Sequence, residues 1–332
     1  MNERLKKIAI TLVIPAGVFL FFSLLLLGRD TTLFSTTNHF RTFINAFAVT
    51  TFIAWALNFN LSTGRFDFSL GSISLLSSIL GAKFMWYLEN LGWEMNGWYM
   101  LIAIVVIGAV LGTISGLAYI ILKIPPIVTS LGMTLIYEAL GFIATDGGGV
   151  VLNRTLHLTK IASPQNQIIV LAIGFVAIYL ISNKTSFGFH WRSLVAGQKI
   201  AVDTGINEKS NAVISYALSG AFVSVAGCFT MSIQGNASAS LNFGTISTIF
   251  VAFLPLFIGG FIGRYSEDKF GILLGSFTTA LITLGFVRLN ISAQMQSFWN
   301  AIILLGFLIY LNNEYKILSF FTKKKRVNRQ PE

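Results

Sequence analysis

Long apolar runs follow one another along the whole chain, and only short polar stretches separate them. Ten of these runs approach the ~20 residues that a helix needs to cross a bilayer. The predicted spans are about 8–27, 40–59, 72–87, 100–122, 127–144, 168–181, 212–233, 245–261, 270–287 and 298–311. The pattern predicts an all-α polytopic membrane protein with about ten transmembrane helices, and we treat 1–332 as a single transmembrane domain.

The polar stretch 64–72 between the second and third runs organises this prediction. It is either the end of a span or a break inside one. We expect Asp67 to cap the helix that starts near Ser69, because both residue types favour helix N-termini. Gly64 and Gly71 allow the backbone to bend or to approach another chain segment closely.

The composition leaves no room for a soluble domain. The 332 residues are 54% hydrophobic and 11% charged, whereas a soluble domain carries about 25% charged residues. Much of the formal net charge of +10 lies near the two ends, as expected for cytoplasmic termini at 1–7 and 313–332 under the positive-inside rule. The tail is also suited to anionic lipid. Nucleic-acid binding is not expected, because no basic residues are interleaved with stacking aromatics.

The longest internal polar segment, 182–210, is rich in Lys and Arg and is predicted to be cytoplasmic. In the span 100–122, small residues recur at intervals of four, which favours close helix packing. These residues are Gly108, Gly112 and Gly116.

Two short motifs recur in the second half of the chain. Residues 71–74 (GSIS) resemble 244–247 (GTIS), and residues 108–112 resemble 271–275. Each pair lies five predicted spans apart, so the sequence suggests a 5+5 inverted repeat. Chance matches between small residues remain an alternative. If the repeat holds, Gln234 and Asn242 lie near a second break and join Ser69 as candidates to line a pathway.

Several kinds of chemistry have no sequence signal. The chain has no P-loop motif for ATP and no metal-binding pattern, so we expect no cofactor bound by this chain. Glu138 and Lys83 are the main titratable side chains inside predicted spans, and an interhelical hydrogen bond or snorkelling is the simpler interpretation of each. With so few titratable groups, the energy for transport is expected from another subunit.

Three motifs carry a resemblance to a known family. Residues 64–72 (GRFDFSLGS) are similar to a G-G-I-D-L-S-V-G-S motif, and residues 122–133 (LKIPPIVTSLGM) to L-x-I-P-P-F-I-V-T-L-G. Residues 185–188 and 196–206 resemble a T-x-F-G…G-x-N-x-x-A-A-x-x-S-G-I motif. Over most of residues 40–312, the chain resembles the membrane permeases of ribose-type ABC importers, which include autoinducer-2, xylose and galactoside permeases.

The resemblance implies an inner-membrane permease for a sugar or sugar-like solute. Its expected partners are a second permease subunit, cytoplasmic ATPases that bind ATP and Mg²⁺, and an extracytoplasmic substrate-binding protein. The segment 182–210 then becomes an ATPase-coupling segment, whose candidate residues are Gly197, Gln198, Ala201, Val202, Gly205 and Ile206. The candidate pathway or gating residues are Gly64, Asp67, Ser69, Gly71, Gln234 and Asn242.

The chain departs from the family pattern in two places. Arg65 and Phe66 replace Gly and Ile, and residues 261–271 replace a glycine-rich continuation. These changes favour a heterodimer with a more typical permease over a homodimer, but leave both open. A nucleoside or branched-chain amino acid permease and an ATPase-independent secondary transporter remain alternatives. An intramembrane hydrolase is not expected, because no paired catalytic residues occur.

Overall fold

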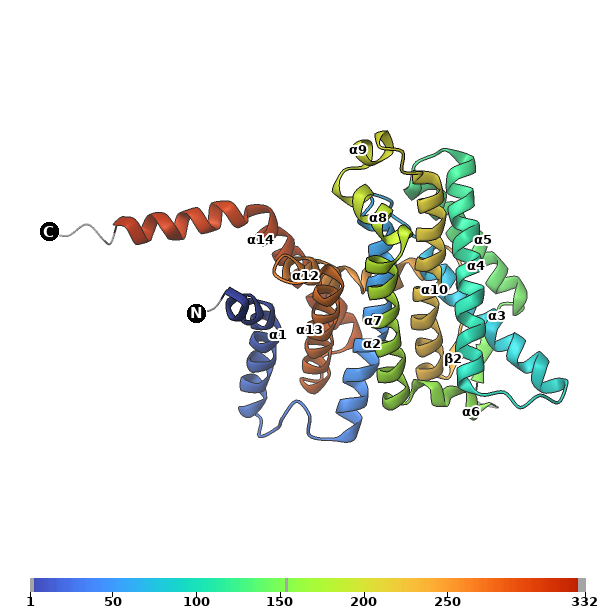
Figure 1. The fold of residues 1–332 in the computed structure, drawn as a ribbon. Helices are drawn as coiled ribbons and strands as arrows, with labels where there is room; N and C mark the ends of the chain where they lie inside the picture. Colours follow the sequence, from blue (N-terminus) through green and yellow to red (C-terminus); the bar gives the residue numbers. More distant parts are fainter. Residues whose placement is uncertain (1–2, 153–154, 328–332) are drawn as a thin grey trace.

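The chain forms a bundle of helices (Figure 1). The computed structural model describes residues 3–152 and 155–327, with the side chains of 11–313 except 156. In order, the elements are α1 (Glu3–Leu27), α2 (Thr37–Leu61), α3 (Leu70–Asn90), α4 (Gly97–Leu122), α5 (Pro126–Ala144), β1 (Val150–Val151), α6 (Leu156–Thr159), η2 (Lys160–Ala162), α7 (Pro164–Lys184), α8 (Ser186–Ala196), α9 (Gln198–Asp203), α10 (Glu208–Gln234), β2 (Asn236–Ala237), η3 (Gly244–Ile246), α11 (Ser247–Phe250), α12 (Phe253–Gly263), α13 (Asp268–Arg288) and α14 (Ala293–Val327).

Eight helical segments of the described chain are long and apolar enough to cross a membrane. They are α2, α4, α5, α7, α10, Gly244–Gly263, α13 and Ala293–Asn313. The other two predicted spans correspond to α1, whose apolar part is Thr11–Leu27, and to α3, which is 21 residues long but carries several serines. The prediction of an all-α polytopic membrane protein is therefore confirmed.

Three groups of helices lie side by side in the bundle (Figure 1). Helices α2, α7 and α10 occupy the middle, with α3, α4 and α5 on one side and α1, α12, α13 and α14 on the other. One buried apolar cluster joins the middle group to α3 and α4, and a second joins the start of α2 to α1, α12 and α13. Helix α2 contributes to both clusters and so ties the two sides together.

The two ends of the bundle carry different connections (Figure 1). Helices α8 and α9 lie at one end, where Asn207 caps α10 by accepting a hydrogen bond from the Ser210 N–H at 3.1 Å. At the opposite end, β1 pairs antiparallel with β2, with Val150 opposite Ala237 and Val151 opposite Asn236. This short pairing joins the segment after α5 to the segment after α10.

The predicted span 245–261 is present as the segment Gly244–Gly263, but its helix is not continuous, because the structure divides it into η3, α11 and α12. The interruption between α11 and α12 falls at Val251 and Ala252. Pro255 has no N–H to donate to the Val251 carbonyl, and its ring clashes with a carbonyl at that position. Helix α11 therefore ends at Phe250, and α12 begins at Phe253, two residues before the proline.

The structure adds helices that the sequence did not predict. The segment 182–210 contains the short helices α8 and α9, and the segment 145–165 contains β1, α6 and η2. Helix α14 runs on into the basic tail, while residues 1–2 and 328–332 of the predicted terminal segments lie outside the described residues.

Candidate functional site

The first helix break, residues 62–69, connects α2 to α3 and turns at Gly64, whose φ is +77°. Asp67 is fully buried there. Its Oδ1 accepts hydrogen bonds from the backbone N–H and the hydroxyl of Ser69, at 2.9 and 2.6 Å. Asn60 donates to its Oδ2 at 3.4 Å. Asp67 thus holds the start of α3, while the Ser69 side chain makes no capping hydrogen bond of its own.

Polar side chains continue from the first break to α5. The Ser69 hydroxyl lies 3.4 Å from that of Ser115 on α4, which lies 3.1 Å from the Tyr137 hydroxyl. Tyr137 donates in turn to the Leu111 carbonyl at 2.7 Å. All these side chains are buried, so hydrogen bonding compensates for the cost of removing them from water.

The second break lies just before η3, where Asn242 and Phe243 have φ values of +58° and +64°. Glu138 of α5 binds this segment. Its Oε2 accepts from the Phe243 N–H at 2.9 Å, and its Oε1 accepts from the N–H and hydroxyl of Thr245 at 2.9 and 2.7 Å. Of the two interpretations offered for Glu138, the structure shows the hydrogen-bonded one.

The helical segments that follow the two breaks, α3 and η3, contact each other directly. Gly71 lies so close to the Thr245 carbonyl that a Cβ could not be accommodated. The Phe66 ring stacks on Phe253 of α12 with ring centroids 5.6 Å apart. The two motifs that resemble each other in sequence, 71–74 and 244–247, therefore face each other in space.

A polar cavity of about 230 Å³ lies beside this contact, between α3, α10 and residues 236–248. Its lining is Gly71, Ser74, Leu75, Ser78, Gly227, Thr230, Met231, Gln234, Asn236, Ala237, Ser238, Ser240, Gly244, Thr245 and Thr248. No lining side chain is charged, and most are small and neutral. The cavity can therefore offer a solute hydroxyl and amide hydrogen bonds but no ion pair.

Of the six predicted pathway residues, two line the polar cavity and four do not. Gly71 and Gln234 line the polar cavity. Gly64, Asp67, Ser69 and Asn242 do not line it, and Asp67 and Ser69 are fully buried. The sequence missed Ser78, Thr230 and Thr245 as lining residues, although serines and threonines inside apolar spans were the available signal.

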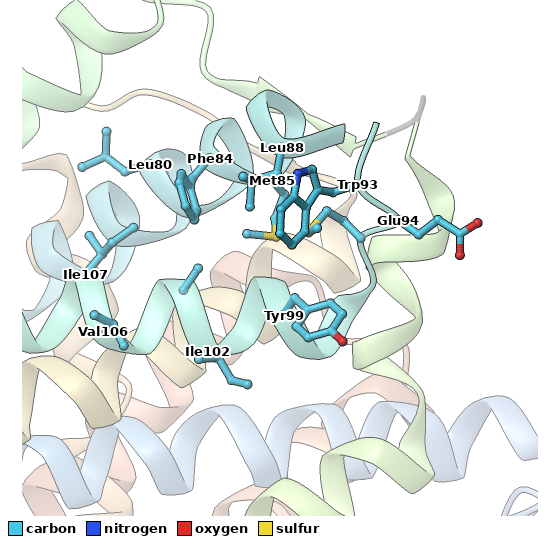
Figure 2. Close-up of a pocket in the computed structure, with 12 residues that line it drawn as sticks. Leu80, Phe84, Met85, Leu88, Trp93, Glu94, Tyr99, Ile102, Val106 and Ile107 are labelled. Carbon is cyan, nitrogen blue, oxygen red and sulfur yellow. The ribbon is translucent and has the colours of Figure 1, made fainter. Parts of the chain in front are cut away.

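A larger cavity of about 760 Å³ lies on the outer side of the bundle between α3 and α4 (Figure 2). Apolar side chains such as Leu80, Phe84 and Ile107 form it. Glu94 is the one charged lining residue and points away from the groove in Figure 2. This groove suits hydrocarbon chains rather than a polar solute.

The predicted coupling residues lie on and around α9 at the end of the bundle that carries α8. Gln198 and Val202 are exposed on α9, whereas Ala201 is buried against the bundle. Gly197 precedes α9 and Gly205 and Ile206 follow it, with Gly205 at a φ of +95°. Ile200, which the sequence did not single out, is the most exposed apolar side chain of α9 at 72%.

The small-residue ridge of α4 lies against α10. Gly108 contacts Gly220 and Ser224, Gly112 contacts the Tyr216 carbonyl, and Gly116 contacts Val213 and Tyr216. The backbones approach so closely that none of these three glycines has room for a Cβ. This contact fixes α10, and with it one wall of the polar cavity.

A polytopic helical bundle whose spans break beside a polar cavity is the architecture of a membrane permease. The sequence model of the family described as "Branched-chain amino acid transport system / permease component" matches residues 40–311, and the chain belongs to this family. No solved structure matches the chain.

Several curated proteins are similar to the chain over most of its length. The fructose import permease protein FruF of Bifidobacterium longum is 25% identical over 82% of this chain and 77% of its own. The autoinducer 2 import system permease protein LsrC of Photorhabdus luminescens is 26% identical over 75% and 74%. The galactose/methyl galactoside import permease protein MglC of Salmonella typhimurium is 24% identical over 93% and 96%.

Proposed function

We propose that this chain is the permease subunit of an ABC importer that carries a sugar or sugar-like solute across the cytoplasmic membrane. Membership of the permease family supports the transport role. The relatives named for fructose, autoinducer 2 and galactose import support the solute class.

The uncharged lining of the polar cavity is the observation that carries the choice of a sugar. Neutral hydroxyl and amide groups match the many hydroxyls of a sugar, because each can donate or accept. An amino acid would bring two charges into a site that has no charged partner for either, at a high desolvation cost. A nucleoside would bring a flat base, yet no aromatic side chain lines the cavity.

The partners in this proposal are a second permease subunit, two cytoplasmic ATPases and an extracytoplasmic binding protein. Helix α9 is the proposed contact with an ATPase, since Ile200 and Val202 are exposed outside the predicted spans at 72% and 42%. In this arrangement both termini lie in the cytoplasm.

Reconstitution in liposomes tests the proposal against an ATPase-independent carrier. The chain would be assayed alone, then with its ATPase and second permease subunit, and then with the binding protein added. We expect sugar uptake only from the complete assembly, and only when ATP is supplied on the side of the bilayer that carries the ATPases. Uptake by the chain alone, at the rate of the complete assembly, would overturn the proposal.

A further inference from the structure

Arg65 is a buried charge that the structure only partly satisfies. It lies in the first break, is 3% exposed, and replaces the glycine of the resembling motif. Its Nη1 lies 3.8 Å from Oε1 of Glu208, and among the described residues its Nε and Nη2 have no hydrogen-bond partner. Burying a guanidinium costs several kcal/mol, which this single ion pair offsets only in part. A packing role alone would be served better by an apolar residue.

Glu208 connects Arg65 to the coupling segment. It is the first residue of α10, and the same Oε1 accepts a hydrogen bond from Nε2 of Gln198 at 2.6 Å. Gln198 is the first residue of α9. One carboxylate oxygen therefore joins the exposed helix α9 to the buried first break.

The other side of Arg65 leads to the polar cavity. The backbone N–H of Arg65 donates to the Asn60 carbonyl at 2.9 Å. The Asn60 side chain in turn donates to Asp67, whose carboxylate binds the start of α3. Gly71, the second residue of α3, lines the cavity and touches Thr245 of η3. A shift of Glu208 thus has a continuous packed route to the cavity wall.

We propose that the Arg65–Glu208 ion pair is the link through which a displacement of α9 reaches the first helix break and the wall of the polar cavity. The inference rests on the proposed function, since it assigns α9 to the ATPase contact. Arg65 and Glu208 are positioning residues here, because neither lines the polar cavity. The resembling motif has glycine at the position of Arg65, and glycine has no side chain to form this ion pair. The pair is therefore a feature of this chain.

The test measures sugar uptake per ATP hydrolysed in the complete assembly in liposomes. Arg65→Met removes the charge but keeps an apolar stem, and Glu208→Gln removes the partner's charge. We expect each to leave ATP hydrolysis in place and to lower uptake per ATP by roughly tenfold, as for residues that act through one contact. The double variant is expected to be no worse than either single variant.

Two further variants separate the link from general damage. Gln198→Ala removes only an exposed side chain, so folding is preserved and a smaller fall in uptake per ATP is expected. Lys209→Gln changes the neighbouring exposed charge, which is outside the pair, and is expected to behave as the unchanged protein. Copurification of the ATPase checks that every variant assembles.

The outcomes are distinguishable. If the unchanged assembly takes up no sugar, the proposed function fails. If it transports and the assembled Arg65→Met and Glu208→Gln variants keep uptake per ATP within about twofold, the link is overturned while the function stands. Additive losses in the double variant would also overturn it, because independent sites add.

Discussion

Two adjacent residues of α5 hold the two helix breaks. Tyr137 reaches the first break through Ser115, and Glu138 binds backbone N–H groups of the second. A carboxylate that accepts from N–H groups at the start of a helical segment also interacts favourably with the helix dipole. We therefore infer that α5 fixes the positions of the two breaks relative to each other.

Replacing Glu138 with Gln tests this role. One of the two carboxylate oxygens becomes an amino group, which cannot accept from Phe243 or Thr245. The unpaired buried group is expected to cost about 1–3 kcal/mol. Hydrogen exchange measured by mass spectrometry is expected to speed up at residues 243–245. Glu94→Gln, at an exposed carboxylate, provides the control; unchanged exchange at 243–245 would contradict the assignment.

At the scale of single residues, the sequence predicted where the two breaks lie better than it predicted their hydrogen-bond partners. Polar residues and glycines between apolar runs marked 64–72, and a short motif match pointed to 244–247. The partners of Glu138 lie 105 and 107 residues further along the chain, and no local pattern encodes such a distance. Asp67 was expected to cap the helix that starts near Ser69, and its Oδ1 does accept from the Ser69 N–H.

At the scale of the element, the contact between α4 and α10 depends on backbones that nearly touch. Gly112→Ala places a Cβ against the Tyr216 carbonyl, which belongs to the backbone and cannot move aside easily. We expect a loss of about 1–3 kcal/mol from this overpacking, seen as earlier thermal unfolding in detergent. Gly132→Ala on α5 has open space around the added methyl group and serves as the control. Equal stability of the two variants would contradict the close contact.

Helix α9 gives a second prediction at the element scale. Ile200→Asp places a charge on its most exposed apolar side chain and is expected to weaken ATPase copurification by at least about tenfold. Lys199→Gln, on the same helix, is expected to retain it. Ala201 is unsuitable for this test, because a charge at that buried position would also disturb the bundle. Normal copurification by Ile200→Asp would argue against α9 as the contact.

The order of the long helices was predictable because each long apolar run has no stable alternative to a helix in lipid. The interruption at Val251 and Ala252 was missed, since a proline is often tolerated in a membrane helix. Helix α8 was missed as well, because the segment that contains it was interpreted only as a cytoplasmic connection.

At the scale of the whole molecule, two buried apolar clusters meet along α2, and α3 and η3, which follow the two breaks, meet beside the polar cavity. The inverted repeat stays a prediction. Helix α4 packs on α10 and α13 packs on α2, as exchanged halves would. However, Gly112 contacts α10 whereas its proposed equivalent, Gly275, contacts α12. The motif match at 71–74 and 244–247 is the stronger part of that hypothesis.

If the solute passes through the polar cavity, a cysteine placed there should be accessible from water and protected by the solute. Cys228 is the protein's one cysteine and is fully buried, so the background is expected to be silent to a membrane-impermeant thiol reagent. Thr230→Cys adds a thiol to the cavity lining, and Leu91→Cys adds one at an exposed turn away from it.

In the complete assembly, we predict that reagent bound at Thr230→Cys abolishes sugar uptake and that the transported sugar slows the reaction of this thiol. At Leu91→Cys the reagent is expected to react without changing uptake, with or without sugar. Full uptake after complete modification at Thr230→Cys would contradict a pathway through this cavity.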